Sequence, residues 1–245
     1  PSRTKESGNV CPDNPPPVIN SNKKCLIDKM LIIPVIDISN GVVVHAVRGK
    51  RKSYQPITSV ICDSCDPESI LSAFFKLYPF KIIYIADLDA INGKKNHSKL
   101  INEFAKSYKE CEFWVDAGLK NVLLKNSDYV GKNIKLILGS ENNISLSKYQ
   151  NIINNNPDII LSLDFNENGL INNSYLLDIV AYWPKKVIVM TLHLVGSNSG
   201  FDNNILAYIL EINKNSEIYL AGGIRNYDDI KSLKLKNING CLIAT

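Results

Sequence analysis

The sequence lacks several features that would assign it to a class at once. No apolar run approaches the roughly 18 to 20 residues that cross a bilayer, so a membrane protein is not expected. The net charge is only +4, from 28 basic and 24 acidic residues spread along the chain, which argues against nucleic acid and anionic membranes as partners. Collagen-like and coiled-coil repeats are also missing.

Cysteine is sparse and unpatterned. Of six cysteines, only Cys62 and Cys65 have the spacing of a metal or redox pair, and no second Cys or His pair stands nearby. The favoured interpretation is free thiols in a reducing compartment, which predicts a cytoplasmic location; a zinc or redox role is the alternative. We therefore expect no bound metal.

Residues 1–29 differ from the rest because they are rich in Pro, Asn, Ser and Lys and have no apolar periodicity. They lack the apolar core of a secretory signal, and the prolines oppose a transit-peptide helix. We interpret them as a disordered tail or translated leader, with Met30 as a candidate start site. The chain begins with Pro1 and ends inside an apolar run at Thr245, so it is expected to be a fragment at both ends.

From Met30 onward, short β-branched and apolar runs alternate with helix-like stretches. The predicted strands are 31–37, 81–87, 112–116, 134–139, 158–164, 186–191, 217–221 and 240–244. The predicted helices are 69–77, 98–108, 145–154, 174–182, 203–213 and 227–235. Continuous apolar strands at this pitch predict one α/β domain over 30–245, a (β/α)8 TIM barrel truncated after its eighth strand, with the last helix missing.

A doubly wound open sheet is the alternative fold. It would normally carry a glycine-rich G-x-G-x-x-G turn after its first strand, and Asp37-Ile-Ser-Asn-Gly41 is not one. The long first interval instead contains Asn40-Gly41 followed by an apolar run, which predicts a β-hairpin arm.

The two halves of the chain resemble each other. Residues 32–37 (IIPVID) parallel 159–164 (IILSLD), and 114–121 (WVDAGLKN) parallel 219–226 (YLAGGIRN). The barrel is therefore expected to consist of two repeated half-barrels.

Carboxylates end several predicted strands, where such barrels place their active sites. Asp37 and Asp164 end strands one and five, which lie opposite each other in a ring of eight, so this pair is the candidate acid and base. Loop capping is the alternative for both. For Asp87 and Asp89, after the second strand, we favour a structural role.

Glycines mark candidate phosphate sites. Gly222 and Gly223 end the seventh strand, and the loops after strands seven and eight commonly bind phosphate. The repeat predicts a second site at Gly118 and at Gly139-Ser140. Plain backbone requirements are the alternative reading of these glycines.

The loop from Gly196 to Gly200 could be a mobile flap, or an ordinary surface loop. Thr191 could donate a hydrogen bond to the substrate. Arg48 begins a basic run that either contacts an anionic substrate or is a solvated face. The three histidines are interpreted as structural: His45, His97 and His193.

Four segments together resemble the HisA/HisF family of histidine biosynthesis, and its isomerase more closely. They are Ile33-Pro-Val-Ile-Asp-Ile38, Tyr84-Ile-Ala-Asp-Leu-Asp-Ala-Ile91, Ser162-Leu-Asp164 and Ala221-Gly-Gly-Ile-Arg225. The resemblance covers residues 31–245. It implies an Amadori rearrangement of an aminoaldose to an aminoketose, without metal or organic cofactor, by Asp37 and Asp164. It also implies a sugar substrate with a phosphate at each end.

The sequence departs from that isomerase pattern after strand three. A Gly-Gly-Gly-Ile-Arg type of turn is usual there, whereas this chain has Asp116-Ala-Gly-Leu-Lys120, with a carboxylate near the second phosphate site. The arm at 42–49 resembles a side branch found in methanogens and methylotrophs, linked to one-carbon carrier metabolism. The alternatives are therefore a paralogue with another phosphorylated substrate in that metabolism, and a non-catalytic barrel that binds a phosphate ligand or protein partner. The oligomeric state stays open.

Overall fold

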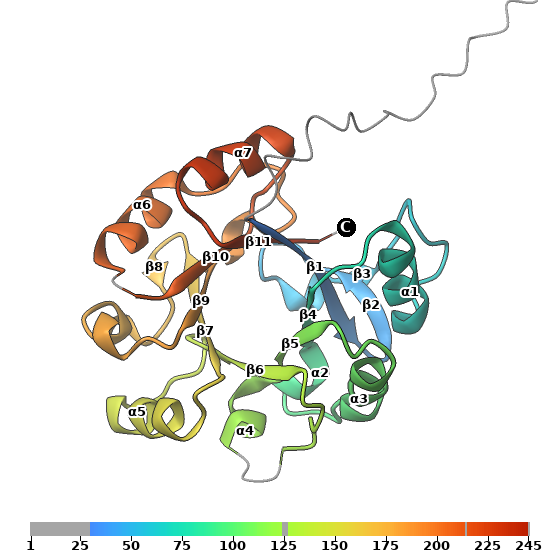
Figure 1. Cartoon of the computed structure of the whole chain (residues 1–245), viewed down its shortest axis with the longest axis horizontal. Helices are drawn as coiled ribbons and strands as arrows, with labels where there is room; N and C mark the ends of the chain where they lie inside the picture. The colour runs from blue at the N-terminus through green and yellow to red at the C-terminus, as the bar shows by residue number, and fades with distance from the viewer. Residues whose placement is uncertain (1–29, 124–126, 214, 245) are drawn as a thin grey trace, which may run out of the picture.

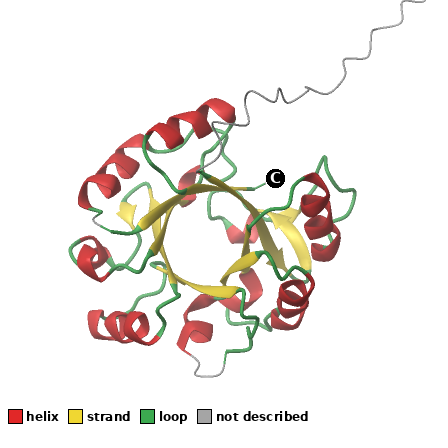
Figure 2. Cartoon of the chain, in the orientation of Figure 1, coloured by secondary structure: helices red, strands yellow, loops and turns green. Residues whose placement is uncertain are grey.

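The computed structural model describes residues 30–123, 127–213 and 215–244. Within these ranges, eight parallel strands form a closed barrel (Figures 1 and 2). They are β1 (Leu31–Ser39), β4 (Ile82–Asp87), β5 (Glu112–Asp116), β6 (Ile134–Gly139), β7 (Ile160–Asn166), β9 (Lys186–Thr191), β10 (Glu217–Ala221) and β11 (Gly240–Ile243). Pairing of Leu31 with Gly240 closes the ring, which confirms the predicted TIM barrel and excludes the open sheet.

Helices surround the barrel on the outside, as Figure 2 shows. They are α1 (Pro67–Leu77), α2 (Leu88–Ile91), α3 (Ser98–Ser107), α4 (Gly118–Leu123), α5 (Leu146–Asn155), α6 (Asn203–Ile212) and α7 (Tyr227–Leu235). The sequence predicted the start of α1 well, since the side chain of Asp66 caps it by accepting from the N–H of Ser69 and Pro67 occupies the first turn. The short helices α2 and α4 were not predicted.

The predicted helix over 174–182 is wrong. The segment forms two 3-10 turns, η3 (Ser174–Leu177) and η4 (Val180–Tyr182). The carbonyl of Leu176, which an α-helix would offer to the N–H of Val180, instead accepts a 2.8 Å hydrogen bond from Nε1 of Trp183. Buried Trp183 thus takes the acceptor on which a continuous helix would depend.

The predicted hairpin arm is present. Strand β2 (Val42–His45) runs antiparallel to β1, and β3 (Gln55–Pro56) extends the arm. Asn40 and Gly41 both have positive φ, at 50° and 80°, as a tight primed turn requires. The second half repeats this feature, because β8 (Gly169–Leu170) folds back antiparallel on β7.

The apolar core has an inner and an outer part. Residues such as Ile33, Tyr84, Ile160 and Ile188 form one cluster drawn mostly from strands around the ring, while two other clusters include residues from the longer helices outside it. Inside the barrel, the rings of Trp114 and Tyr219 meet edge to face with centroids 4.7 Å apart. These two residues occupy equivalent positions in the sequence repeat.

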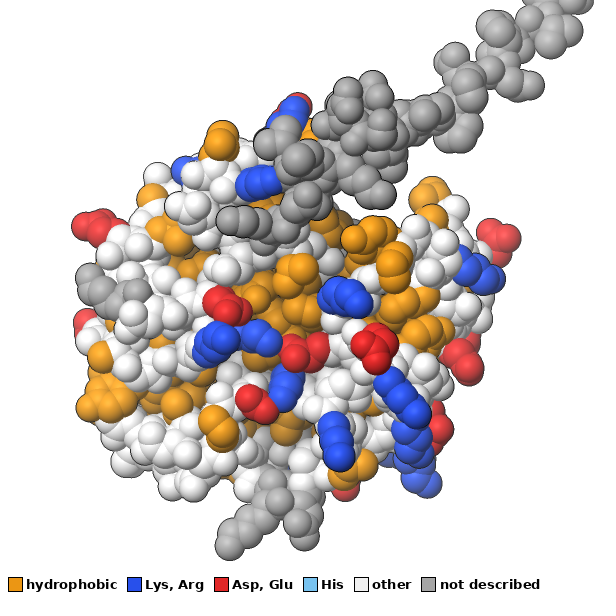
Figure 3. Space-filling view, in the orientation of Figure 1, with side chains coloured by type: hydrophobic (Ala, Val, Ile, Leu, Met, Phe, Trp, Pro, Cys, Tyr) orange, Lys and Arg blue, Asp and Glu red, His pale blue; other side chains and the backbone are white. Residues whose placement is uncertain are grey.

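The N-terminal end of the barrel is closed by ion pairs. Nζ of Lys186 lies 2.9 Å from a Glu112 carboxylate oxygen and 5.3 Å from the Trp114 ring centroid. Side chains of both charge signs are interspersed on the face seen in Figure 3. In the described ranges, no helix has the length and apolarity needed to cross a membrane.

Two further 3-10 turns lie near the barrel mouth. The first, η2 (Arg51–Ser53), is part of the arm, and the second, η5 (Leu192–Leu194), follows β9. Residues 1–29, for which a tail or leader was expected, lie outside the described residues, as does Thr245.

Candidate active site

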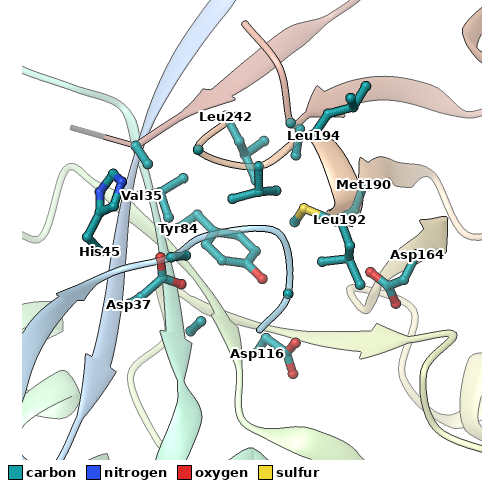
Figure 4. Close-up of a pocket in the computed structure, with 18 of the residues that line it drawn as sticks. Val35, Asp37, His45, Tyr84, Asp116, Asp164, Met190, Leu192, Leu194 and Leu242 are labelled. Atoms are coloured by element: carbon teal, nitrogen blue, oxygen red, sulfur yellow. The ribbon is translucent and has the colours of Figure 1, made fainter. Parts of the chain in front are cut away.

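A cavity of about 260 Å³ opens at the carboxyl ends of the barrel strands. Asp37 from β1 and Asp164 from β7 both line it, and Figure 4 shows them on opposite sides of the cavity. The sequence predicted this placement because β1 and β7 are the first and fifth strands of the ring. Asp116, Glu141 and Arg51 line the same cavity.

Asp164 is buried and held by three groups. Oγ of Ser162 donates to its carboxylate at 2.7 Å, and the hydroxyl of Ser140 and the N–H of Glu141 each lie 3.3 Å from the other oxygen. Burial raises the pKa of Asp164 to about 7, and nearby Glu141 raises it further against the lowering effect of the Ser162 hydrogen bond. The carboxyl can therefore be protonated or ionised near neutral pH.

Asp37 is half-buried, and no hydrogen bond to its carboxylate occurs among the described residues. Burial raises its pKa to about 7, Arg51 opposes that shift, and Asp116 adds to it. Asp37 and Asp164 thus have matched pKa values in one cavity, which suits two groups that exchange protons with the same substrate.

Asp116 ends β5 and lines the cavity, between Asp37 and Asp164 in the view of Figure 4. Burial raises its pKa to about 6, although a hydrogen bond from the N–H of Gly118, at 3.1 Å, acts in the opposite direction. The sequence predicted that a carboxylate would lie near the second phosphate site, and the structure places it in the cavity.

The arm after β2 crosses toward the far rim of the barrel. The guanidinium of Arg51 pairs with the carboxylate of Glu141, which follows β6. The N–H of Arg48 donates to the carbonyl of Val195 at 2.9 Å, while its side chain is exposed and does not line the cavity. Of the basic run, Arg51 is therefore the residue that reaches the site.

Gly222, Gly223 and Gly196 line the cavity. Gly222 and Gly223 have φ of +96° and +82°, and a Cβ on Gly223 would lie 2.1 Å from the carbonyl oxygen of Gly200. Backbone packing thus requires both glycines. Their N–H groups, and that of Ile224, form no hydrogen bond in the described part of the chain, so they stay available to an anion.

The other predicted site residues lie outside the cavity lining: Gly118, Gly139, Ser140, Thr191, Gly200 and Arg48. Gly118 packs against the backbone of Ile91, and Gly200 packs against the Arg225 guanidinium. The Thr191 hydroxyl donates to the carbonyl of Ala221 at 3.0 Å, which ties β9 to β10.

Asp87 has the structural role that was expected. Its buried carboxylate accepts from the N–H groups of Ala90 and His97, and from the hydroxyl of Tyr129 at 2.7 Å. Asp89 accepts from the N–H of Asn40 at 2.5 Å and so fixes the start of the hairpin arm. The His97 ring lies between these two carboxylates.

Cys62 and Cys65 precede α1 as free, half-buried thiols. No cluster of three or more potential metal-binding side chains occurs in the ranges that the structure describes. His45 lines the cavity, whereas Nδ1 of His193 is buried without a hydrogen-bond partner in the described structure.

Sequence reasoning missed Tyr84 and Glu141 as cavity residues. Tyr84 stands within a continuous apolar strand, where its ring resembles ordinary core content, and only its inward register reveals its position. Glu141 stands two residues after Gly139, which ends β6. Its contact with Arg51 joins residues far apart in the chain, so no local pattern shows it.

The fold and the site together define a (β/α)8 barrel with a carboxylate-lined cavity at the carboxyl ends of its strands. Residues 31–245 match the family described as histidine biosynthesis protein, and the chain belongs to that family. It is similar to an uncharacterized protein of Methanocaldococcus jannaschii, with 32% identity over 88% of this chain and 92% of that protein. It is also similar to a phosphoribosyl imidazole-4-carboxamide isomerase of Buchnera aphidicola, with 20% identity over 87% of this chain and 92% of that enzyme.

Proposed function

We propose that the protein is an intramolecular isomerase that converts a phosphorylated aminoaldose to an aminoketose. The observation that carries the proposal is the pair Asp37 and Asp164, on opposite sides of one cavity, with pKa values of about 7. The similarity to an imidazole-4-carboxamide isomerase supports the same reaction class.

The chemistry needs one acid and one base. The protonated carboxyl donates its proton to the sugar ring oxygen, the bond from that oxygen to C1 breaks, and the amine nitrogen forms a protonated imine with C1. The ionised carboxyl then removes the proton from C2, which gives an enolamine. Return of a proton to C1 and loss of the O2 proton produce the aminoketose. Atoms and electrons balance, because the product is an isomer of the substrate.

The remaining parts of the cavity have roles that fit this reaction. The free N–H groups of Gly222, Gly223 and Ile224 can bind a substrate phosphate. Arg51 faces Asp37 and favours its ionised form. The arm can exclude water from the open-chain intermediate, since its backbone is bonded to the loop after β9.

The direct test is conversion of the histidine-pathway aminoaldose, followed by the appearance of the aminoketose. Turnover, and rescue of a strain that lacks the pathway isomerase, would support the proposal. Specific binding of the aminoaldose with no turnover would favour a non-catalytic barrel.

A second candidate is a related enzyme that acts on another phosphorylated substrate. The observation that favours it is the presence of Asp116 and Glu141 in the cavity, at the end where the family pattern predicts a second phosphate. Failure of the rescue, together with turnover of a different phosphorylated sugar, would select it.

A further inference from the structure

The two ends of the cavity differ in what their backbone offers a ligand. At the β10 end, Gly222, Gly223 and Ile224 line the cavity, and their N–H groups are unbonded within the described chain. At the β5 and β6 end, the corresponding N–H groups are already used. Gly118 donates to Asp116, Ser140 donates to the carbonyl of Ser162, and Glu141 donates to Asp164.

Acceptors of the chain itself, two of them carboxylates, therefore take the N–H groups that a phosphate would need at the β5 and β6 end. A Cβ placed on Gly139 would lie 3.2 Å from Asp164 Oδ2 and 4.0 Å from Asp116 Oδ2, so these two carboxylates flank the same glycine. Arg51 is the one guanidinium or ammonium group among the described cavity residues, and it is already paired with Glu141. A second phosphate here would meet uncompensated negative charge.

Tyr84 gives an independent sign that a ligand belongs at this end. The residue is 5% exposed and its ring projects into the cavity (Figure 4), where Asp116 is the charged group that acts most strongly on its hydroxyl. No hydrogen bond to that hydroxyl occurs in the described part of the structure, and the hydroxyl is not among the fully buried polar atoms that lack a partner, so it is open to the cavity. The hydroxyl is thus free to bond with a substrate held between Asp37, Asp116 and Asp164.

We infer that the cavity accepts a substrate with one phosphate at the Gly222–Ile224 end and a positively charged amine at the Asp116–Asp164 end. This inference rests on the second candidate function, a related enzyme that acts on another phosphorylated substrate, and deepens it by defining the substrate class of the same site. The bound ammonium is then a different group from the neutral nitrogen that forms the imine. A bound ammonium would interact favourably with the surrounding carboxylates and could accept no bond from Tyr84, so the Tyr84 hydroxyl would bond to a neighbouring substrate oxygen. The substrate is then a monophosphate and not a bisphosphate.

The titration of the site agrees with this assignment. Burial, and then repulsion from nearby carboxylates, raises the pKa values of Asp37, Asp116 and Asp164, and burial followed by these three carboxylates raises the pKa of Tyr84. A cation placed among them would stabilise the ionised carboxylates and lower those pKa values. Amine binding near pH 7 should therefore release protons, whereas binding of a phosphate at this end would take them up.

The test is calorimetric binding of three defined probes to the full chain: glucosamine 6-phosphate, glucose 6-phosphate and glucose 1,6-bisphosphate. We expect glucosamine 6-phosphate to bind at least tenfold more tightly than glucose 6-phosphate, with proton release measured in two buffers of different ionisation enthalpy. The bisphosphate should bind most weakly. Inorganic phosphate should compete with both monophosphates.

Two variants connect the preference to the proposed residues. Asp116→Asn and Glu141→Gln should each reduce the preference for the amine and strengthen binding of the bisphosphate. Asp158→Asn is the matched control, because Asp158 precedes β7 at the opposite end of the barrel and pairs with Lys135, so the preference should not change. Circular dichroism should show that each variant is folded.

Equal affinity for the two monophosphates, absence of binding by either, or tightest binding by the bisphosphate would overturn the inference. The measurement reports binding and not turnover, so its result can refute this inference without refuting the proposed isomerase activity. An amine preference in a chain with no isomerase activity would keep this inference and refute the isomerase. Isomerase activity with a preference for bisphosphates would do the reverse.

Discussion

The hydroxyl of Ser140 and the backbone of Asp164 are bonded to each other across the ends of β6 and β7. The N–H of Asp164 donates to Ser140 Oγ at 2.8 Å, and that hydroxyl lies 3.3 Å from the Asp164 carboxylate. Both residues are buried. Ser140 was expected to bind phosphate, and this contact instead indicates that it positions a candidate catalytic carboxyl.

Ser140→Ala should therefore lower kcat and leave KM for the phosphorylated substrate nearly unchanged. It removes the acceptor of a buried N–H, so the free energy of unfolding should fall by about 1 to 3 kcal/mol. Steady-state kinetics and urea unfolding measure the two effects. A large rise in KM with constant kcat would assign Ser140 to phosphate binding.

Asp37→Asn should reduce turnover by about two to four orders of magnitude, because it removes a group that transfers protons. The side chain keeps its size and makes no hydrogen bond in the described structure, so the fold, and the binding of a phosphate at the Gly222–Ile224 end, should persist. Product formation and calorimetric binding, measured on the same preparation, separate the two. Unchanged turnover would remove Asp37 from the mechanism.

The same variant should change stability in a pH-dependent way. The pKa of Asp37 is raised from 3.8 to about 7 in the folded protein, so ionisation opposes folding as the pH rises between these values. The cost is fully present above about pH 7 and vanishes below pH 3.8. We expect Asp37→Asn to raise the free energy of unfolding at pH 8 by ~1 kcal/mol or more, and therefore to raise Tm. Near pH 4 the substitution should have little effect. A lowered Tm of this variant at pH 8 would contradict the raised pKa of a desolvated Asp37 carboxyl.

The pH profile of kcat/KM should be bell-shaped and centred near pH 7, because one carboxyl of the pair must be ionised and the other protonated. Ser162→Ala removes a hydrogen bond that lowers the pKa of Asp164, so one limb of the profile should move to higher pH. A profile that is flat between pH 5 and pH 9 would show that this pair does not control the rate.

Gly196→Ala should disturb the arm. A Cβ at this position would lie 2.6 Å from the carbonyl oxygen of Ala46, and φ is +63°. Displacement of the arm would move Arg51 away from the site, so KM should rise about tenfold. Gly93→Ala is the matched control, since its φ of +73° carries a similar strain with no atom within 4 Å of the new Cβ. Equal effects of the two variants on KM would show that backbone strain alone, and not the contact with Ala46 in the arm, causes the change.

Much of the barrel could be predicted from the sequence because its signals are local. Continuous apolar runs marked β5, β6, β9 and β10 at their observed bounds, and Asp66-Pro67 marked the start of α1. The helix expected over 174–182 failed because the indole of Trp183 bonds to the Leu176 carbonyl, a contact that no local pattern shows.

The sequence by itself determined the ring of strands, the hairpin arm and the opposed pair Asp37 and Asp164, because strand order and strand-end position follow from periodicity along the chain. Only the tertiary structure decided which backbone N–H groups stay free, since a neighbouring strand can supply the acceptor: the carbonyl of Ser162 accepts from the N–H of Ser140, and the carboxylate of Asp164 accepts from that of Glu141. It also decided that Arg51 and not Arg48 reaches the cavity, because the arm bonds to Val195 and Glu141, which lie in the loops after β9 and β6. Contacts between residues far apart in the chain set the chemistry of this site, and local sequence cannot specify them.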